Sequence, residues 1–229
     1  MAAIKVISAG AVKAIIVALA PEFERASGHT LDLNFGTAGA GRDRVKGGEA
    51  ADLVVLSESI IAGLGDLVKD VTDLGRTVSG VIVREGAAEP DISTPDAYKQ
   101  SLLKAKSFAY TDPKAGGSGG IMLVEVMKRL GVLDAVNAKA VLCKNGHHVS
   151  TTVAEGGAEL GTTFISEALP VKGCKVIGTL PGDLHIANTY TAAIHAKAAS
   201  PDGARAFLDF LTDPSRRARW TAAGLEPAF

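Results

Sequence analysis

The chain has 229 residues, 47% of them hydrophobic and 21% charged, enough for one large or two small domains with a packed core. These fractions are typical of a soluble globular protein and exclude disordered and fibrous classes. The 24 Lys and Arg residues balance 25 Asp and Glu residues, so no large net charge draws the chain to nucleic acid or to a membrane surface. Any selectivity for anions must therefore be local.

The start of the chain bears on its location. It opens directly with the strand-like IKVIS and lacks the basic, apolar and small-residue sections of a secretory signal. No apolar run reaches the length of a membrane-spanning helix, so we expect no membrane insertion. We expect a cytoplasmic protein as the sequence is written, or a periplasmic one if the printed chain is a trimmed mature form.

Cysteine and histidine usage argues against a metal. Cys143 and Cys174 are the only cysteines, without a CxxC motif or a histidine cluster at metal-ligand spacing. We therefore expect neither a metal nor a cofactor. Both cysteines fall in strand-like runs, and they are either two buried thiols or a bridge between neighbouring strands.

Strand-like and helix-like segments alternate in the first third of the chain, as in a βαβ series. Helices are expected from about Ala11, after the glycines of GTAGAG, and from about Ser57. Pro21 lacks an amide hydrogen, so we expect a kink or break near Ala18. Gly28 is expected to cap the end of that helix. The strands expected here are IKVIS, LDLNF and DLVVL.

A second series begins at about Thr77, with a helix start at Ser93 or Thr94 before Pro95. Further on, HIANTYTAAIHAK reads as a strand that returns to the first half, and two helices close the chain. We predict two α/β lobes with the chain crossing between them twice: lobe I is residues 1–78 and 183–229, and lobe II is residues 79–182. The other strands expected are VSGVIVREG, SFAYTDP, KAVLC, ELGTTFI and KVIGTL.

Three junctions between a strand and a helix combine glycine with small hydroxyl residues. They lie at residues 8–10, 36–42 and 111–120. The first turn of a helix leaves amide donors unsatisfied and carries partial positive charge, so small residues there let a carboxylate or oxyanion approach. Singly, each junction is an ordinary capped turn; together they favour a shared anion site in a cleft between the lobes.

Nucleotide and hydrolase chemistry fit these junctions poorly. GGSGG is followed by Ile121 and Met122 rather than by Lys and Ser or Thr, and GTAGAGR does not match GxGxxG. A GxSxG elbow is absent, and no histidine can be paired with Ser118 from the sequence alone.

Four charged or titratable residues near the junctions are candidates. Arg42 lies one turn into its helix and either holds a carboxylate in bidentate fashion or is solvated. His147 and His148 follow a strand and a glycine; one faces the cleft as a donor or an acid/base group, or both are loop residues without a catalytic duty. Glu167 is either a proton acceptor or a helix-start glutamate.

The junction sequences, from SAGAVKAIIVALAPEFERASGHTLDLNFGTAGAGRDRVKGGEAADLVVLS through SFAYTDPKAGGSGG to GAELGTTFISEALP, resemble a known family. They are similar to the type II periplasmic solute-binding proteins related to the molybdate-binding component of ABC importers, over nearly the whole chain. The resemblance implies a two-lobed α/β Venus-flytrap fold, each lobe a central sheet flanked by helices, that closes on a small anion. It implies that Ser8 and Thr37 clasp the anion. The molybdate binders carry a tyrosine where this chain has Phe164, Ile165 and Ser166, which favours a small organic acid.

Two functions stay open. The first is a solute-binding protein for a small anion, an organic polycarboxylate or oxyanion, with an ABC permease as partner. The second is an isomerase of unsaturated polycarboxylates, similar to an aconitate isomerase branch of the same superfamily. In it, Arg42 and loop amides stabilise an enolate-like carboxylate while a base moves a proton. The candidate bases are His147, His148 and Glu167. The predicted ligand-binding residues are Ser8, Ala9, Gly10, Thr37, Ala38, Arg42, Gly117, Ser118, Gly119, His147 and Ser166.

Overall fold

The structure is a computed structural model that describes residues 3–229. The chain divides into two compact units. Unit 1 takes the residues up to Arg76 together with Asn188–Phe229, and unit 2 takes Thr77–Ala187. Two strands carry residues of both units: β4 (Val68–Arg84) and β9 (Ala187–His195).

The sheet of unit 1 is built on three parallel strands in the order β2-β1-β3. These are β1 (Ala3–Ala9), β2 (Thr30–Gly36) and β3 (Leu53–Ser57). Strand β9 pairs antiparallel with β3, β4 lies next to β9, and β10 (Glu226–Pro227) pairs with β4. Ser8 pairs with Phe35 on β2 and with Val55 on β3, so the three parallel strands end at one edge of the sheet.

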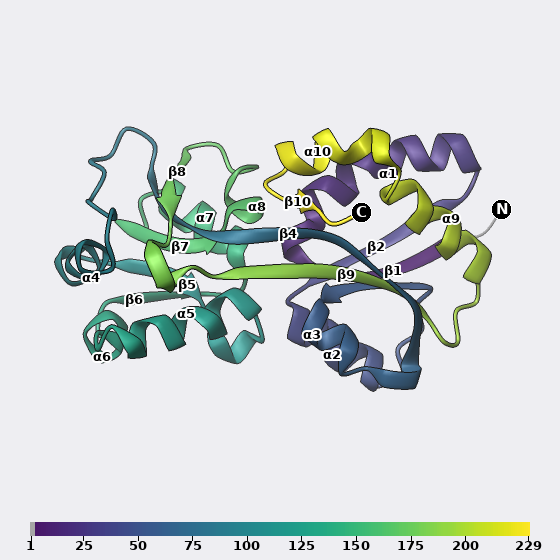
Figure 1. Ribbon diagram of the computed structural model, residues 1–229, viewed down its shortest axis with the longest axis horizontal. Coiled ribbons are helices and arrows are strands. Elements are labelled where there is room, and N and C mark those ends of the chain that lie inside the picture. Colours follow the sequence, from purple (N-terminus) through teal and green to yellow (C-terminus); the bar gives the residue numbers. More distant parts are fainter. Residues whose placement is uncertain (1–2) are drawn as a thin grey trace. The chain divides into compact units, whose positions relative to one another are not determined.

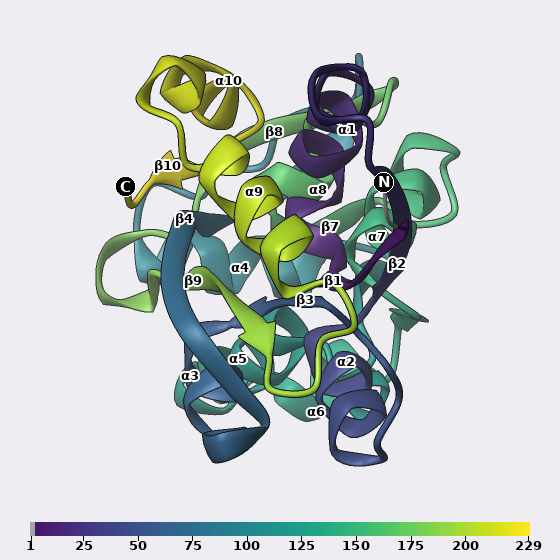
Figure 2. The same ribbon diagram turned by 90° about the vertical axis from the view of Figure 1, so that its right-hand side faces the viewer.

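Helices cover both faces of this sheet (Figures 1 and 2). On one face α1 (Lys13–Ser27) packs on α9 (Pro201–Leu211), where the rings of Phe23 and Phe207 lie 4.8 Å apart between centroids. On the other face lie α2 (Ala38–Lys46) and α3 (Glu58–Ala62). Gly41 allows α2 to approach, since an added Cβ would lie 2.5 Å from Leu56 Cδ2. The C-terminal helix of this unit is α10 (Arg217–Ala222).

A kink or a break was predicted near Ala18; helix α1 runs unbroken through Pro21, so the break is wrong. A proline costs a helix one hydrogen bond, and the buried side chains of Leu19 and Phe23 on either side hold the helix on the sheet. Gly28 ends the helix with φ 71°, which confirms the predicted cap.

The sheet of unit 2 has the order β8-β4-β7-β5-β6. Strands β5 (Phe108–Thr111), β6 (Ala140–Cys143) and β7 (Leu160–Phe164) are parallel, whereas β4 runs antiparallel to β7 and to β8 (Cys174–Thr179). As in unit 1, the parallel strands end at one edge. Strand β4 is longer than the predicted VSGVIVREG because it already begins at Val68.

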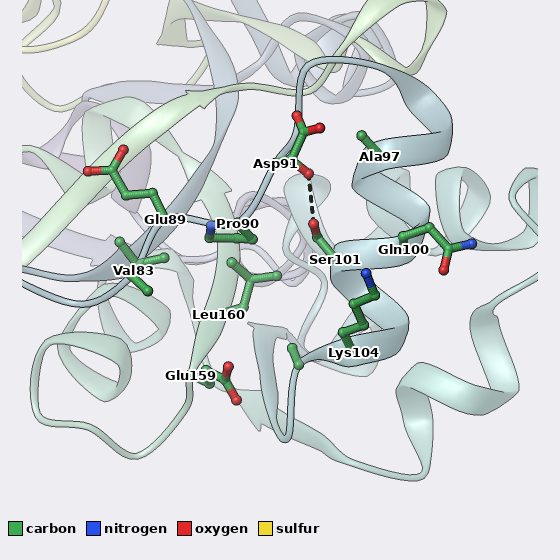
Figure 3. A pocket seen from close by; sticks show the side chains of 12 residues that line it. Val83, Glu89, Pro90, Asp91, Ala97, Gln100, Ser101, Lys104, Glu159 and Leu160 are labelled. Atoms are coloured by element: carbon green, nitrogen blue, oxygen red, sulfur yellow. Dashed lines mark hydrogen bonds between the residues drawn. The ribbon is translucent and has the colours of Figure 1, made fainter.

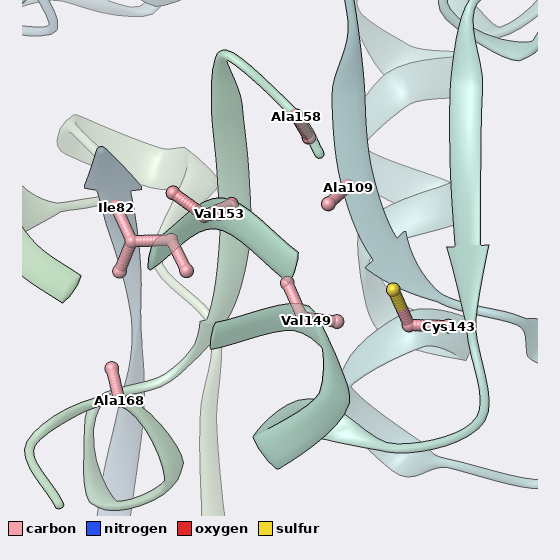
Figure 4. Close-up of a cluster of buried hydrophobic side chains, with 7 residues drawn as sticks. All are labelled: Ile82, Ala109, Cys143, Val149, Val153, Ala158 and Ala168. Atoms are coloured by element: carbon pink, nitrogen blue, oxygen red, sulfur yellow. The ribbon is translucent and has the colours of Figure 1, made fainter. Parts of the chain in front are cut away.

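The helices of unit 2 lie on both faces of its sheet, with α5 and α6 on one face and α7 and α8 on the other (Figure 1). A buried cluster joins α7 to β4, β5 and β6 and includes Ile82, Val149, Val153 and Cys143 (Figure 4). Thr94 caps the helix that starts at Pro95, as predicted. The helices are α4 (Pro95–Lys104), α5 (Ser118–Arg129), α6 (Leu133–Asn137), α7 (Gly146–Ala154) and α8 (Ile165–Ala168). Short 3-10 turns are η1 (Gly10–Val12), η2 (Gly65–Leu67), η3 (Pro113–Ala115), η4 (Gly182–Leu184) and η5 (Pro214–Arg216).

Both cysteines lie in strands and are free thiols, which excludes the bridge. Cys143 is fully buried, and Cys174 packs against the same cluster. Burial raises the pKa of both thiols, that of Cys174 to about 11, so neither is a reactive thiolate at neutral pH.

Candidate functional site

The edge at which β1, β2 and β3 end brings together two of the predicted junctions of unit 1. Ser8 is the penultimate residue of β1 and is 1% exposed, and its hydroxyl makes one long contact, 3.2 Å, to the carbonyl of Ala9. Thr37 follows the last residue of β2. Ala9, Gly10 and Ala38 belong to the same two turns.

The start of α2 presents backbone amide donors at the edge where β1, β2 and β3 end. Thr37 Oγ1 accepts from the Ala40 amide at 3.2 Å, and the Gly41 amide bonds to the Thr37 carbonyl at 3.0 Å. The amides of Ala38 and Gly39 precede these two, so they have no acceptor within the helix. Both residues are buried, and their donors are therefore suited to a ligand rather than to bulk water.

Arg42 lies in α2 with its side chain exposed. Its Nε donates to Asp43 Oδ1 at 2.8 Å, and this bond raises the pKa of Arg42 and lowers that of Asp43. Arg44 makes two bonds to Glu49, whose pKa falls to about 2 mainly because of them. A role for Arg42 in holding a carboxylate stays a prediction.

In unit 2, the start of α5 presents a glycine-rich turn beside the end of β7. Gly117 occupies the N-cap position and provides no side-chain cap. An added Cβ at Gly119 would lie 3.0 Å from Cε2 of Phe164, so that ring packs directly on the first turn of the helix. Gly117, Ser118 and Gly119 thus lie beside the last residue of β7.

The start of α7, by contrast, is occupied by a carboxylate from the chain itself. Glu167 accepts hydrogen bonds from the amides of Gly146 and His147 and from the hydroxyl of Thr163. Burial outweighs these bonds and raises the pKa of Glu167 from 4.5 to about 7. Gly146 is required here, because an added Cβ would lie 2.0 Å from Glu167 Oε2.

The two histidines of this turn are exposed. The Nδ1 atom of His148 accepts the Lys144 amide at 3.3 Å, and the His148 amide donates to Asn145 Oδ1 at 2.9 Å. His147 contributes its backbone amide to the Glu167 carboxylate. Ligand or catalytic roles for their imidazoles stay predictions.

Two buried serine hydroxyls have no hydrogen-bond partner among residues 3–229. Ser166, predicted as a ligand residue, is 2% exposed and lies two residues beyond the end of β7. Ser57 is 1% exposed and is the last residue of β3. The sequence indicated Ser57 only as the start of a helix, because no glycine follows it as Gly10 follows Ser8.

A pocket of about 480 Å³ lies elsewhere in unit 2, between the end of β4 and α4 (Figure 3). It adjoins Leu160, the first residue of β7, and is therefore at the opposite edge of the sheet from Phe164. Its walls carry Glu89, Asp91 and Glu159 beside Lys104. This acidic lining suits an anion less well than the turns at the other edge.

The model of the bacterial extracellular solute-binding protein family matches residues 4–226. The chain belongs to this family. Among its relatives, an aconitate isomerase from a Pseudomonas species is 33% identical over 97% of this chain and 87% of that protein. The molybdate-binding protein ModA of Escherichia coli is 25% identical over 86% of this chain and 78% of its own length.

Solved structures confirm the type II periplasmic-binding fold of this solute-binding protein. The sulfate-binding protein SubI from Mycobacterium tuberculosis superposes with a TM-score of 0.79 at 19% identity, over 100% of this chain and 88% of that one. Within residues 3–229, none of the helices combines the length and apolar character needed to cross a bilayer. The same residues contain no group of three or more His, Cys, Asp or Glu side chains arranged to hold a metal ion.

Proposed function

We propose that this solute-binding protein binds a small organic anion with more than one carboxylate. The observation that carries the proposal is the edge of unit 1, where Ser8, Thr37 and Ser57 lie at or next to the ends of three adjacent parallel strands. The buried amides of Ala38 and Gly39 start a helix at the same edge. Amides and hydroxyls at a helix start bind carboxylates and oxyanions without a charged partner.

Two observations favour a polycarboxylate over a tetrahedral oxyanion. The relative named aconitate isomerase shares 33% of its aligned residues with this chain, against 25% for the relative named for molybdate. In addition, the stretch that carries a tyrosine in the molybdate binders has Phe164 here, whose ring packs against the first turn of α5 and carries no hydroxyl.

Titration calorimetry with citrate, trans-aconitate, tricarballylate, sulfate and molybdate tests the proposal. We expect at least one tricarboxylate to bind and to raise the melting temperature. If none of the three tricarboxylates binds, the proposal is wrong, even if sulfate or molybdate does.

Thr37 and Thr94 form a matched pair for this experiment. Each caps a helix by accepting the amide three residues on, at 3.2 Å from Ala40 and 3.1 Å from Ala97. Replacing either by alanine removes one cap and costs about 1 kcal/mol of stability. Only Thr37→Ala is expected to weaken binding; equal affinities for both variants would remove Thr37 from the site.

A second function, isomerisation of an unsaturated polycarboxylate, is favoured by Glu167. A pKa of about 7 leaves this carboxyl partly deprotonated at neutral pH, as proton abstraction and return require. Three donors fix its orientation. In this reaction Glu167 takes a proton from a carbon next to the double bond, the electron pair shifts across the allylic carbons, and the Glu167 carboxyl, after its proton has exchanged with solvent, delivers a proton to the far carbon.

Proton NMR in deuterated buffer tests this reaction with trans-aconitate. We expect turnover with deuterium entering the product, a rate that rises as Glu167 deprotonates near pH 7, and loss of turnover in Glu167→Gln. Binding without turnover or deuterium uptake would leave the chain a receptor only.

We also propose that the protein works outside the cytoplasmic membrane with an ABC permease as partner. The family is that of extracellular solute-binding proteins, and a receptor of that kind meets its ligand before the permease does. Fractionation of cells that express the complete reading frame, with the permease retained by affinity capture, tests both statements. A cytoplasmic location and no capture of the permease would contradict them.

A further inference from the structure

Among the described residues, the buried serine hydroxyls without a hydrogen-bond partner are those of Ser57 in unit 1 and Ser166 in unit 2. Ser101 Oγ donates to the Asp91 carbonyl at 2.7 Å, and Ser150 Oγ donates to the Gly146 carbonyl at 3.1 Å. Ser57, although it occupies the N-cap position of α3, makes no cap bond, and its Oγ has no partner among residues 3–229. A buried hydroxyl left without a partner costs about 1–3 kcal/mol, so such groups are rare unless something else binds them.

The register of the sheet determines which way Ser57 points. Ser8 on β1 pairs with the residue two before Ser57 on β3. Because side chains alternate along a strand, Ser8 and Ser57 lie on the same face of the sheet. Ile7 and Leu56 lie on the other face, where both come within 3.5 Å of the Cβ that Gly41 of α2 would carry. The two serines therefore share the face opposite α2.

Ser57 is the last residue of β3, so it lies at the edge of the sheet where β1, β2 and β3 end. Unpartnered buried side-chain nitrogens also occur on His195 and Arg216. His195 ends β9, which runs antiparallel to β3, so it lies beyond Leu53 at the amino end of β3. Arg216 lies in the η5 turn, outside the sheet. In unit 1, therefore, the unpartnered hydroxyl is the group that lies where the parallel strands end.

We propose that Ser57 donates a hydrogen bond from Oγ to a carboxylate oxygen of the bound anion, beside Ser8 on the same face. This assignment rests on the proposed binding function and adds a specificity residue to it. The ligand supplies the acceptor that the protein lacks, and the desolvation of the hydroxyl is already complete before binding. A ligand whose carboxylate is replaced by a group without an acceptor oxygen loses this bond.

Calorimetry on wild type, Ser57→Ala and Ser101→Ala, with the anion that the wild type binds from the panel above, tests the assignment. We expect Ser57→Ala to bind about 5- to 10-fold more weakly, the loss typical of one hydrogen bond. Its melting temperature without ligand should equal or exceed that of the wild type, since no bond is lost. Ser101→Ala should bind as the wild type does and melt lower.

Each contrary result has a separate meaning. Unchanged affinity in Ser57→Ala overturns the assignment and leaves the binding function standing. If ligand-free Ser57→Ala melts as low as Ser101→Ala, a protein group already accepts a hydrogen bond from the Ser57 hydroxyl. That result also overturns the assignment. A wild type that binds none of the three tricarboxylates refutes the binding function and the assignment with it.

Discussion

Gly146→Ala tests the contact between the start of α7 and the carboxylate of Glu167. The added Cβ would lie 2.0 Å from Glu167 Oε2 and 2.3 Å from Thr163 Oγ1, whereas non-bonded atoms approach only to about 3.5 Å. The carboxylate must retreat by at least about 1 Å. This movement breaks one or both of the hydrogen bonds that the backbone amides of Gly146 and His147 donate to it.

The magnitude follows from three contributions. Losing one hydrogen bond to a charged group costs about 1.5–3 kcal/mol, and overpacking costs about 1–3 kcal/mol. Replacing glycine by alanine in a helix returns about 0.4–1 kcal/mol. We therefore expect Gly146→Ala to lower the free energy of unfolding by about 2–5 kcal/mol. Urea denaturation followed by circular dichroism at pH 8 measures it.

Gly63→Ala is the matched control. Gly63 also lies at a helix terminus with a helical backbone, φ −78°, but an added Cβ there meets nothing closer than 3.5 Å. We expect it to leave stability unchanged or slightly raised. Surface substitutions typically change stability by no more than about 0.5 kcal/mol. If the free energies of unfolding of Gly146→Ala and Gly63→Ala differ by less than this, the reasoning about Glu167 is wrong.

Three further predictions concern stability. Burial raises the pKa of Glu167 from 4.5 to about 7, so the folded state binds this proton more tightly than the unfolded state, and the free energy of unfolding falls as the pH rises from 4.5 to 7. Relative to Glu167→Gln, the wild type should lose about 2–3 kcal/mol of stability over this range. Curves of stability against pH that run parallel for the two proteins would contradict this. Gly120→Ala places a Cβ 2.1 Å from the carbonyl oxygen of Thr111 and should destabilise by about 2–4 kcal/mol in urea, whereas wild-type stability would show that the backbone yields freely. Thr94→Ala removes the cap on Ala97 and should cost about 1 kcal/mol by thermal unfolding, and no change would mean that water replaces it.

Local patterns predicted the strands and most of the helices, because alternation and caps are short-range signals. Thr94 before Pro95 and Gly28 after α1 are such cases. The first half of β4 was not predicted, since the stretch from Val68 is largely exposed and carries Gly75. Gly75 allows β10 to approach β4 closely, since an added Cβ would lie 3.1 Å from the Glu226 carbonyl. Glu226 lies 151 positions further along the chain, so no local pattern could indicate why a glycine stands in this strand.

The candidate site was predictable only in part. Ser8 and Thr37 stand at strand ends that the sequence marks with glycine and small residues. The bond between Glu167 and the start of α7 depends on β7 and β6 flanking β5, which no local pattern encodes. The sequence indicated Ser57 only as the start of a helix, and the coordinates are needed to show that its hydroxyl makes no cap bond.

The order of synthesis matters for unit 1, because the residues of β9 that belong to it follow the whole of unit 2 in the chain. Unit 2 is one continuous segment and can close its core as soon as it leaves the ribosome. Until His195 has emerged, β3 lacks its antiparallel neighbour and leaves the apolar strand LVVLS with an unpaired edge. An edge of that kind invites pairing with other chains, so β9 protects β3 from such pairing once it has joined the sheet.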